Sequence, residues 1–243
     1  MLRSLKRHYM EQLARPGLTG MFVNPFYFAR RELLAGMSEL GKELGGRVLD
    51  VGCGDRPYEN LIPAKEYIGL ELDTPESRTR GRADAFYDGR SFPFADGSFD
   101  AVLCNQVLEH VFAPDEFVRE LARVLRDDGR LLLTVPFVWD EHEQPRDYGR
   151  YSSFGLAALL ARHGFELLQT RKTAADVRAP FQMVNAYLYK ITVSRNPYVN
   201  LLATLVLMAP LNVIGTLLAW VMPSNPDFYL DNVVLARKAA RPA

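Results

Sequence analysis

Residues 47–54, Arg-Val-Leu-Asp-Val-Gly-Cys-Gly, place a short apolar run directly before two closely spaced glycines. A short apolar run of this length predicts a buried strand. Glycines at the carboxyl end of a strand permit a tight turn in which the backbone approaches a ligand, and the helix that follows presents free N–H groups. The segment therefore predicts the first strand of a parallel α/β sheet, with a ligand-binding loop at its end.

Two details separate the kinds of ligand that such a loop binds. The dinucleotide fingerprint G-x-G-x-x-G needs a third glycine where this chain has Pro57, which disfavours a dehydrogenase. Asp50 lies two residues before the first glycine, where its carboxylate can face a cationic group. The segment resembles the first motif of the class I S-adenosylmethionine (SAM)-dependent methyltransferases. The resemblance implies that Asp50, Gly52, Cys53 and Gly54 bind SAM, with Asp50 at its methionine end.

Further segments follow in the order that this family requires. Residues 67–73 predict a second strand, and Glu71 lies 19 residues after Gly52, the place for a carboxylate that binds both ribose hydroxyls. Residues 83–85 resemble the loop whose aspartate binds the adenine amino group. Residues 98–105 resemble the fourth strand. The resemblance adds these residues to the cofactor site: Leu72, Asp84, Ala85 and Asn105.

The rest of the chain completes the expected fold. Residues 119–136 predict a helix, a glycine turn and a fifth strand, and residues 153–163 predict a helix capped by Ser152 or Ser153 and stopped by Gly164. The family resemblance implies a Rossmann-like, seven-stranded α/β methyltransferase sheet with an antiparallel seventh strand. The sixth and seventh strands are expected at residues 165–170 and 228–236. The expected divisions are an N-terminal helical cap at 1–45, a SAM-binding core at 46–173, an apolar helical insertion at 174–226, and a final strand with a tail at 227–243.

Composition narrows the classes of partner. The chain has 29 Lys and Arg against 29 Asp and Glu, so no general nucleic-acid surface is expected. Cys53 and Cys104 are too few for a disulfide framework, and the Cys and His residues lack metal-site spacing, so we expect no bound metal. No secretory signal is evident in the basic N-terminal segment, which predicts a cytoplasmic protein.

The insertion is the unusual part of the chain. No charged residue occurs between Asn196 and Pro226. We expect Pro210 to break the segment into two pieces, each too short to cross a bilayer. Two interpretations stay open: contact with one membrane leaflet through residues 197–223, or packing within the protein or in a homodimer interface.

The loop at 140–151 is the expected place of the acceptor. It resembles a bacterial methyltransferase subgroup with a His-x-x-Pro-x-Asp-Tyr-x-Arg-Tyr signature, associated with surface-glycan and lipid-linked glycan synthesis. His142 is the candidate general base, because a histidine titrates near neutral pH; an alternative is a structural pair with Asp147.

Arg146 and Arg150 are candidates for holding an anionic acceptor, or for pairing with the loop's glutamates. Tyr148 and Tyr151 are candidates for sugar stacking or for packing of the loop. Glu109 and His110 resemble the family's Glu-His pair beside the cofactor, and neither is expected to be catalytic.

The leading hypothesis is a SAM-dependent methyltransferase that methylates an oxygen of a glycan, lipid-linked or small-molecule acceptor. It would act as a peripheral or monotopic protein at the inner face of the membrane. The alternatives are a soluble small-molecule methyltransferase with the insertion as dimer interface, and a SAM-binding scaffold without turnover. The sequence does not identify the acceptor.

Overall fold

The computed structural model describes residues 2–240, with side chains from residue 6 onward. Met1 of the expected cap and residues 241–243 of the expected tail lie outside the described residues. The chain forms two compact units. Unit 1 comprises the residues up to Ala35, the short segment 138–140 and residues 172–231. Unit 2 comprises residues 36–137, 141–171 and those from 232 onward.

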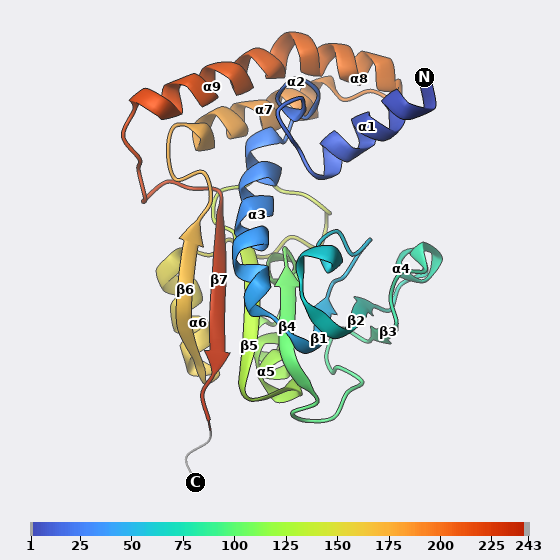
Figure 1. Ribbon diagram of the computed structural model, residues 1–243, viewed down its shortest axis with the longest axis vertical. Helices are drawn as coiled ribbons and strands as arrows, with labels where there is room; N and C mark the ends of the chain where they lie inside the picture. Colours follow the sequence, from blue (N-terminus) through green and yellow to red (C-terminus); the bar gives the residue numbers. More distant parts are fainter. Residues whose placement is uncertain (1, 241–243) are drawn as a thin grey trace. The chain divides into compact units, whose positions relative to one another are not determined.

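Unit 2 is built on the sheet. Within the described residues, seven strands form one sheet in the order β3-β2-β1-β4-β5-β7-β6 (Figure 1). The pairs β1–β2, β1–β4, β2–β3 and β4–β5 are parallel, and β7 runs antiparallel to its neighbours. This is the predicted sheet, and the predicted fold class is confirmed. The strands are β1 (Gly46–Val51), β2 (Ala64–Leu72), β3 (Ala85–Tyr87), β4 (Phe99–Asn105), β5 (Leu125–Pro136), β6 (Phe165–Lys172) and β7 (Asp231–Lys238).

The parallel register brings the expected ligand loops to one edge of the sheet. Asp50 at the end of β1 lies opposite Gly69 of β2 and Leu103 of β4. The loops after β1, β2, β4 and β5 therefore leave from the same edge, where α/β proteins bind ligands. The short elements of unit 2 are η1 (Gly41–Glu43), η2 (Glu59–Leu61), α4 (Pro75–Arg80) and η3 (Leu108–His110).

Two amphipathic helices cover the sheet. Buried side chains of α5 (Pro114–Val124) and α6 (Ser153–Arg162) pack with those of the central strands in one apolar core. The Ser152 hydroxyl accepts a hydrogen bond from the Gly155 N–H at 3.2 Å. Gly164, at φ +78°, follows the end of the helix. Both ends of α6 are therefore where the capping residues predicted them.

Unit 1 is helical. Its elements are α1 (Leu2–Ala14), α2 (Gly20–Val23), most of α3 (Tyr27–Leu40), α7 (Arg178–Thr192), α8 (Pro197–Ala203), a π-helical segment (Thr204–Met208) and α9 (Ala209–Val221). Buried amides join these helices. The Gln182 side chain accepts from the N–H groups of Phe28 and Ala29 at the start of α3 and donates to the carbonyl of Pro25. The backbone donors at that helix start, which need partners outside the helix, are thereby satisfied.

The expected break at Pro210 is wrong. Residues 197–221 form one continuous helix of 25 residues. A proline lacks an N–H and its ring collides with the carbonyl four residues before it, which disrupts an α-helix. Here the wider π-helical turn precedes Pro210, and the Ala209 N–H bonds to the carbonyl of Thr204. The widened turn lets the helix continue through the proline. Among the described residues this helix alone is long and apolar enough to cross a membrane, judged by length and composition only.

Candidate cofactor and acceptor site

Asp50 is a buried carboxylate at the end of β1. It is 3% exposed, and the Tyr67 hydroxyl donates to its Oδ2 at 2.7 Å. Burial raises the pKa of Asp50 to about 7, against the lowering effects of the Tyr67 hydrogen bond and the charge of Arg56. Burial favours the neutral acid, so a cationic ligand group beside Asp50 would restore its charge. The site therefore suits a ligand that brings a positive charge to the end of β1.

Neighbouring side chains contact both glycines of the turn. Gly52 has φ +70°, and a Cβ at this position would lie 2.4 Å from Val107 Cγ2. A larger residue would have to adopt a disfavoured backbone conformation and displace the segment after β4. Gly54 has φ +50°, and its N–H donates to Glu71 Oε1 at 2.6 Å. Glu71, the predicted ribose ligand, is thus held against the turn that contains the predicted methionine-end residues.

Asp84 lies at the next loop of the same edge. Its Oδ2 accepts a hydrogen bond from the Gly69 N–H at 2.8 Å and forms an ion pair with Arg56. The Arg56 side chain is mostly buried and lies over the Tyr67 ring, 5.9 Å from its centroid. Arg56 and Tyr67 were not selected from the sequence, although both lie in the predicted SAM-binding core, because their contacts with Asp84 and Asp50 depend on how the sheet folds.

The other predicted cofactor residues line the same strand ends. Leu72 and Ala85 are half-buried residues at the end of β2 and the start of β3. Asn105 ends β4, and its Oδ1 accepts from the Thr134 hydroxyl of β5 at 2.8 Å. Cys53 is buried, which raises its pKa to about 12. Its thiol is therefore neutral at physiological pH and contributes packing rather than a nucleophile.

An ion pair within the predicted acceptor loop and backbone hydrogen bonds to η3 hold this loop in place. Arg150 donates to both carboxylate oxygens of Asp147, at 2.5 and 2.7 Å. This contact holds the pKa of Asp147 far below its ordinary value, so the carboxylate stays charged. The N–H groups of Tyr148 and Gly149 donate to the carbonyl of Glu109, at 2.8 and 3.2 Å. The loop after β5 is thereby attached to η3, which follows β4.

The candidate acceptor residues differ in exposure. Arg150 pairs with Asp147, which was not an expected partner. The Arg146 side chain is exposed. Tyr148 is half-exposed and packs edge-on against Phe112, with ring centroids 5.4 Å apart. Tyr151 packs against the apolar core. Phe112 is a further exposed aromatic ring that the sequence analysis did not select.

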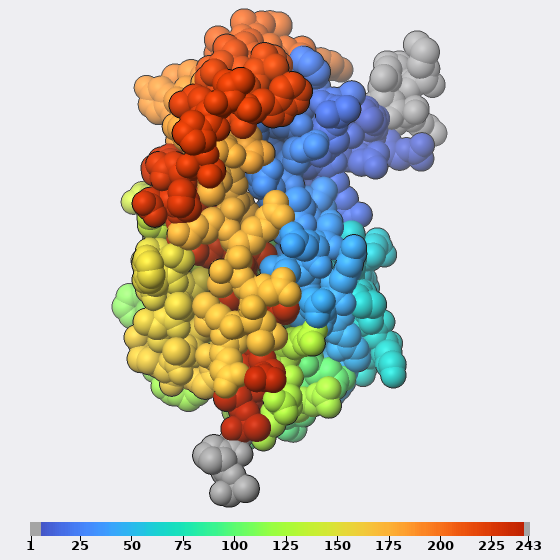
Figure 2. All heavy atoms as spheres, turned by 60° about the vertical axis from the view of Figure 1, so that its left-hand side comes forward, coloured from blue at the N-terminus to red at the C-terminus, as the bar shows by residue number. Residues whose placement is uncertain are grey.

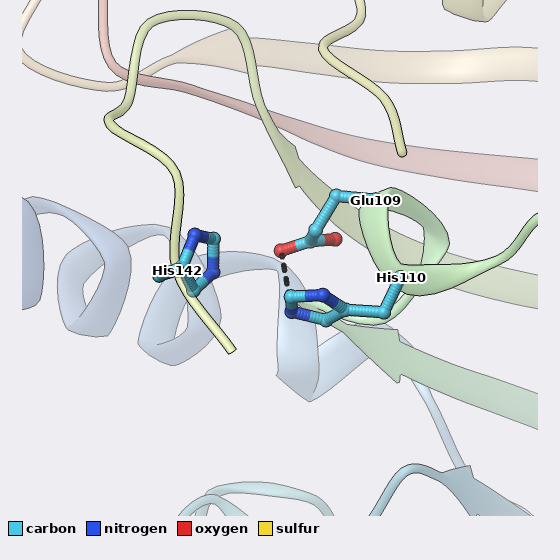
Figure 3. Close-up of side chains that lie close together, drawn as sticks. All are labelled: Glu109, His110 and His142. Carbon is cyan, nitrogen blue, oxygen red and sulfur yellow. Dashed lines mark ion pairs between the residues drawn. The ribbon is translucent and has the colours of Figure 1, made fainter. Parts of the chain in front are cut away.

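The structure brings three side chains together beside this loop. Glu109 and His110 of η3 face His142, and their potential ligand atoms all lie within 4.8 Å of one another (Figure 3). His110 Nε2 lies 3.9 Å from Glu109 Oε1, and the rings of His110 and His142 are 4.8 Å apart. Both the N–H and the Nδ1 of His142 lie against Asp147 Oδ2, at 2.9 and 3.3 Å. Because 31 residues separate His110 from His142, spacing along the chain gave no signal for this cluster.

Comparison with known proteins identifies the family. A family model described as a methyltransferase domain matches residues 49–133. A relative from Mycolicibacterium smegmatis, named as an S-adenosylmethionine-dependent methyltransferase, is 33% identical over 201 residues, which cover 68% of this chain and 77% of the relative. The chain belongs to the S-adenosylmethionine-dependent methyltransferases. SAM is its cofactor. An uncharacterized methyltransferase from Mycolicibacterium gilvum is 38% identical over 101 residues, and that match covers 38% of this methyltransferase and 39% of the relative.

Solved structures share the fold of this methyltransferase. The cyclase SpnF has a TM-score of 0.57 at 22% identity, covering 96% of this chain and 95% of its own. Phosphoethanolamine N-methyltransferase 2 of Haemonchus contortus, solved with SAM, has a TM-score of 0.56 at 18% identity, covering 96% of this chain and 60% of its own. The buried Asp50 and the glycine turn fit such a cofactor, because SAM carries both a sulfonium and an ammonium group.

Proposed function

We propose that this methyltransferase methylates an oxygen of a glycan, lipid-linked or small-molecule acceptor at the cytoplasmic face of a membrane. The observation that carries the membrane part is the outer surface of the helix at 197–221 in unit 1. Figure 2 shows the orange and red atoms of this segment forming a continuous surface. Only 28% of the most apolar 18-residue stretch of this helix is buried.

The buried side chains of this helix follow helical spacing. Thr204, Met208, Asn212 and Gly215 form the buried side of the helix. Large apolar residues are exposed in two stretches of the helix, 198–207 and 214–221. They are Tyr198, Val199, Leu202, Leu205, Val206, Leu207, Ile214, Leu217, Trp220 and Val221. A continuous apolar surface of this kind is uncommon on a monomeric soluble protein and is typical of a membrane or protein contact. The lack of charge from Asn196 to Pro226 favours a bilayer.

The site supports methyl transfer as a displacement. When bound, SAM supplies a methyl group on a positively charged sulfur, which departs as a neutral thioether when an acceptor oxygen takes the methyl. We assign the methionine end to Asp50 and the glycine turn, the ribose to Glu71 and the adenine to Asp84. The acceptor lies by the loop at 141–151, where the exposed Arg146 and Tyr148 are available to an anionic or sugar group. These residues bind and orient, which is most of what the protein contributes to this reaction.

The deciding experiment measures SAM binding by calorimetry on the full chain, with and without anionic liposomes, together with cosedimentation. A variant with Leu202, Val206, Leu217 and Trp220 all replaced by Ser removes exposed apolar groups without touching the buried side of the helix. We expect it to bind SAM as the wild type does and to lose cosedimentation. Phe154→Ser, which removes an equally exposed ring from unit 2, is the matched control and should still sediment.

Other outcomes favour the alternatives. A wild-type protein that ignores liposomes and forms a dimer, with the Ser variant monomeric, would make this surface a homodimer interface in a soluble enzyme. SAM binding without methyl transfer to any membrane, glycan or small-molecule extract would favour a scaffold. Asp50→Ala should abolish SAM binding in a folded protein, and retained binding would contradict the assignment of the cofactor site.

A further inference from the structure

We propose that Glu109, His110 and His142 bind a divalent transition-metal ion, which holds the acceptor oxygen beside the cofactor site. No sequence spacing predicts this site, and it revises the expectation that the protein binds no metal. The inference rests on the proposed methyl transfer for its purpose, but the metal site itself stands on geometry alone. Two of the ligands follow β4 and the third follows β5, which are adjacent parallel strands.

The potential ligand atoms lie farther apart than they would around a bound metal ion. Two ligand atoms about 2.1 Å from a tetrahedral metal are about 3.4 Å apart. His110 Nε2 lies 3.9 Å from Glu109 Oε1 and 4.0 Å from Glu143 Oε2. Rotations that shift each atom by a few tenths of an ångström would close these two gaps, and a separation of 4.8 Å, the widest that the cluster allows, would need about 0.7 Å at each of its two atoms. Glu143 is exposed and lies outside the three-residue cluster, so we do not count it as a ligand.

The tautomer of His110 is fixed by its other nitrogen. His110 Nδ1 lies 2.6 Å from the carbonyl oxygen of Arg146. A carbonyl only accepts, so Nδ1 carries the hydrogen and donates. In the neutral ring the lone pair then sits on Nε2, which faces two carboxylates. A lone pair and carboxyl oxygens repel one another unless a proton, on Nε2 or on a carboxyl group, or a metal ion lies between them.

His142 has a similar arrangement. Its Nδ1 lies 3.3 Å from Asp147 Oδ2, and Arg150 holds that aspartate in its charged form. A carboxylate on Nδ1 favours the tautomer that keeps its lone pair on Nε2. Histidine ligands of metals characteristically donate their second nitrogen to a carbonyl or a carboxylate, which fixes the ring and raises its basicity. One carbonyl and one carboxylate do this here, for two rings whose potential ligand atoms lie within 4.8 Å of one another.

The donor set selects the kind of ion. Two imidazoles and one carboxylate suit first-row transition ions from Mn²⁺ to Zn²⁺, whereas Mg²⁺ and Ca²⁺ prefer oxygen donors. Three protein ligands leave coordination positions open. An acceptor hydroxyl bound there is acidified by the metal, so its proton passes to water as its oxygen takes the methyl group. His142 then acts as a ligand, which replaces the general-base role expected from the sequence.

Metal binding can be tested without any acceptor. Chelator-treated full-length protein is titrated with Mn²⁺ by electron paramagnetic resonance and with Zn²⁺ by calorimetry. We expect one ion per chain, with Mg²⁺ at the same concentration failing to displace Mn²⁺. Glu109→Gln and His142→Gln should each weaken Mn²⁺ binding more than tenfold. Asp147→Asn should weaken it about tenfold, because Asp147 only orients a ligand.

Matched controls separate ligation from damage to the fold. His163 lies 2.9 Å from Asp115 in unit 2 and belongs to a different histidine–carboxylate pair. His163→Gln should leave Mn²⁺ binding unchanged. Glu109→Gln should still fold and bind SAM with wild-type affinity, because the hydrogen bonds to this residue from Tyr148 and Gly149 are made to its backbone carbonyl.

The outcomes separate this inference from the proposed function. Wild-type protein that binds SAM but neither Mn²⁺ nor Zn²⁺ overturns the metal site and leaves the methyltransferase intact. Metal binding that survives both Glu109→Gln and His142→Gln also overturns it. Stoichiometric metal binding lost in those two variants supports the site even where no acceptor oxygen is methylated, in which case the proposed acceptor class is wrong. If Zn²⁺ restores activity to chelated enzyme, His142 acts as a ligand rather than a base.

Discussion

The two units of this methyltransferase differ in the polar side chains that they bury and in the apolar side chains that they expose. Unit 2 has a sheet core of aliphatic and aromatic residues, such as Leu49, Phe99 and Leu133. Unit 1 buries amides, among them Asn24, Gln182, Asn185 and Asn212, and exposes large apolar side chains along α7, α8 and α9. Water drives apolar groups inward. The exposed apolar side chains of unit 1 are the observation on which the proposed membrane contact rests.

The comparison also shows what holds each unit together. In unit 2 burial of apolar area dominates, so stability should follow the volume of core side chains. In unit 1 buried amides bond to backbone groups at helix starts and turns, so stability should follow the satisfaction of polar groups. Four substitutions test this contrast.

Leu103→Ala should have the largest effect. Leu103 lies in β4 at the centre of the sheet and is 1% exposed. Truncation leaves a cavity, and we expect the free energy of unfolding to fall by about 3–4 kcal/mol. Urea denaturation followed by circular dichroism measures this loss. A change below about 1 kcal/mol would mean that the core of unit 2 is loosely packed and that apolar burial does not dominate its stability.

Asn212→Leu should come next, although it makes the interior of unit 1 more apolar. The Asn212 side chain accepts from Asn185 at 2.8 Å and donates to the carbonyl of Met21 at 2.9 Å. Leucine leaves these buried partners unsatisfied, at a cost of about 2–3 kcal/mol. Denaturation of this variant beside Leu103→Ala gives the direct comparison. A stabilised Asn212→Leu protein would show that unit 1 obeys the same rule as unit 2.

The buried carboxylate of unit 2 predicts a pH dependence. The pKa of Asp50 is about 7, above the ordinary 3.8. From about pH 4 to 7 the unfolded chain releases this proton and the folded chain keeps it, so the stability of the SAM-free protein falls as pH rises.

Ionised Asp50 binds the cofactor's positive group, so SAM affinity should rise about tenfold between pH 6 and 8. Calorimetry measures this rise. Asp50→Asn should bind weakly at both pH values; an unchanged pH dependence would assign the titration to another group.

Ile191→Ser should have the smallest effect on stability. This α7 residue is 61% exposed, so we expect the free energy of unfolding to change by less than about 0.5 kcal/mol. Binding to anionic liposomes should nevertheless weaken several-fold if α7 shares the surface formed by α8 and α9. Unaltered sedimentation would restrict the contact to residues 197–221.

The sequence predicts the sheet well, because each strand end carries its own local signal. The apolar run before Gly52 and the capping serine and glycine of α6 act through residues close in the chain. Interactions between distant segments gave no such signal. The Gln182 amide serves a helix start more than 150 residues earlier, and His142 joins Glu109 only through the adjacency of β4 and β5. Pro210 was misjudged because its effect depends on a π-helical turn, which no residue pattern announces.

The attachment of the predicted acceptor loop has a consequence for how this enzyme diversifies. Tyr148 and Gly149 bind to η3 through backbone N–H groups and a backbone carbonyl. Hydrogen bonds between backbone groups survive a change of side chain, so positions such as 146 and 148 can vary while the loop keeps its place. Relatives that share this attachment could therefore acquire different acceptors through surface substitutions alone, without rebuilding the cofactor site.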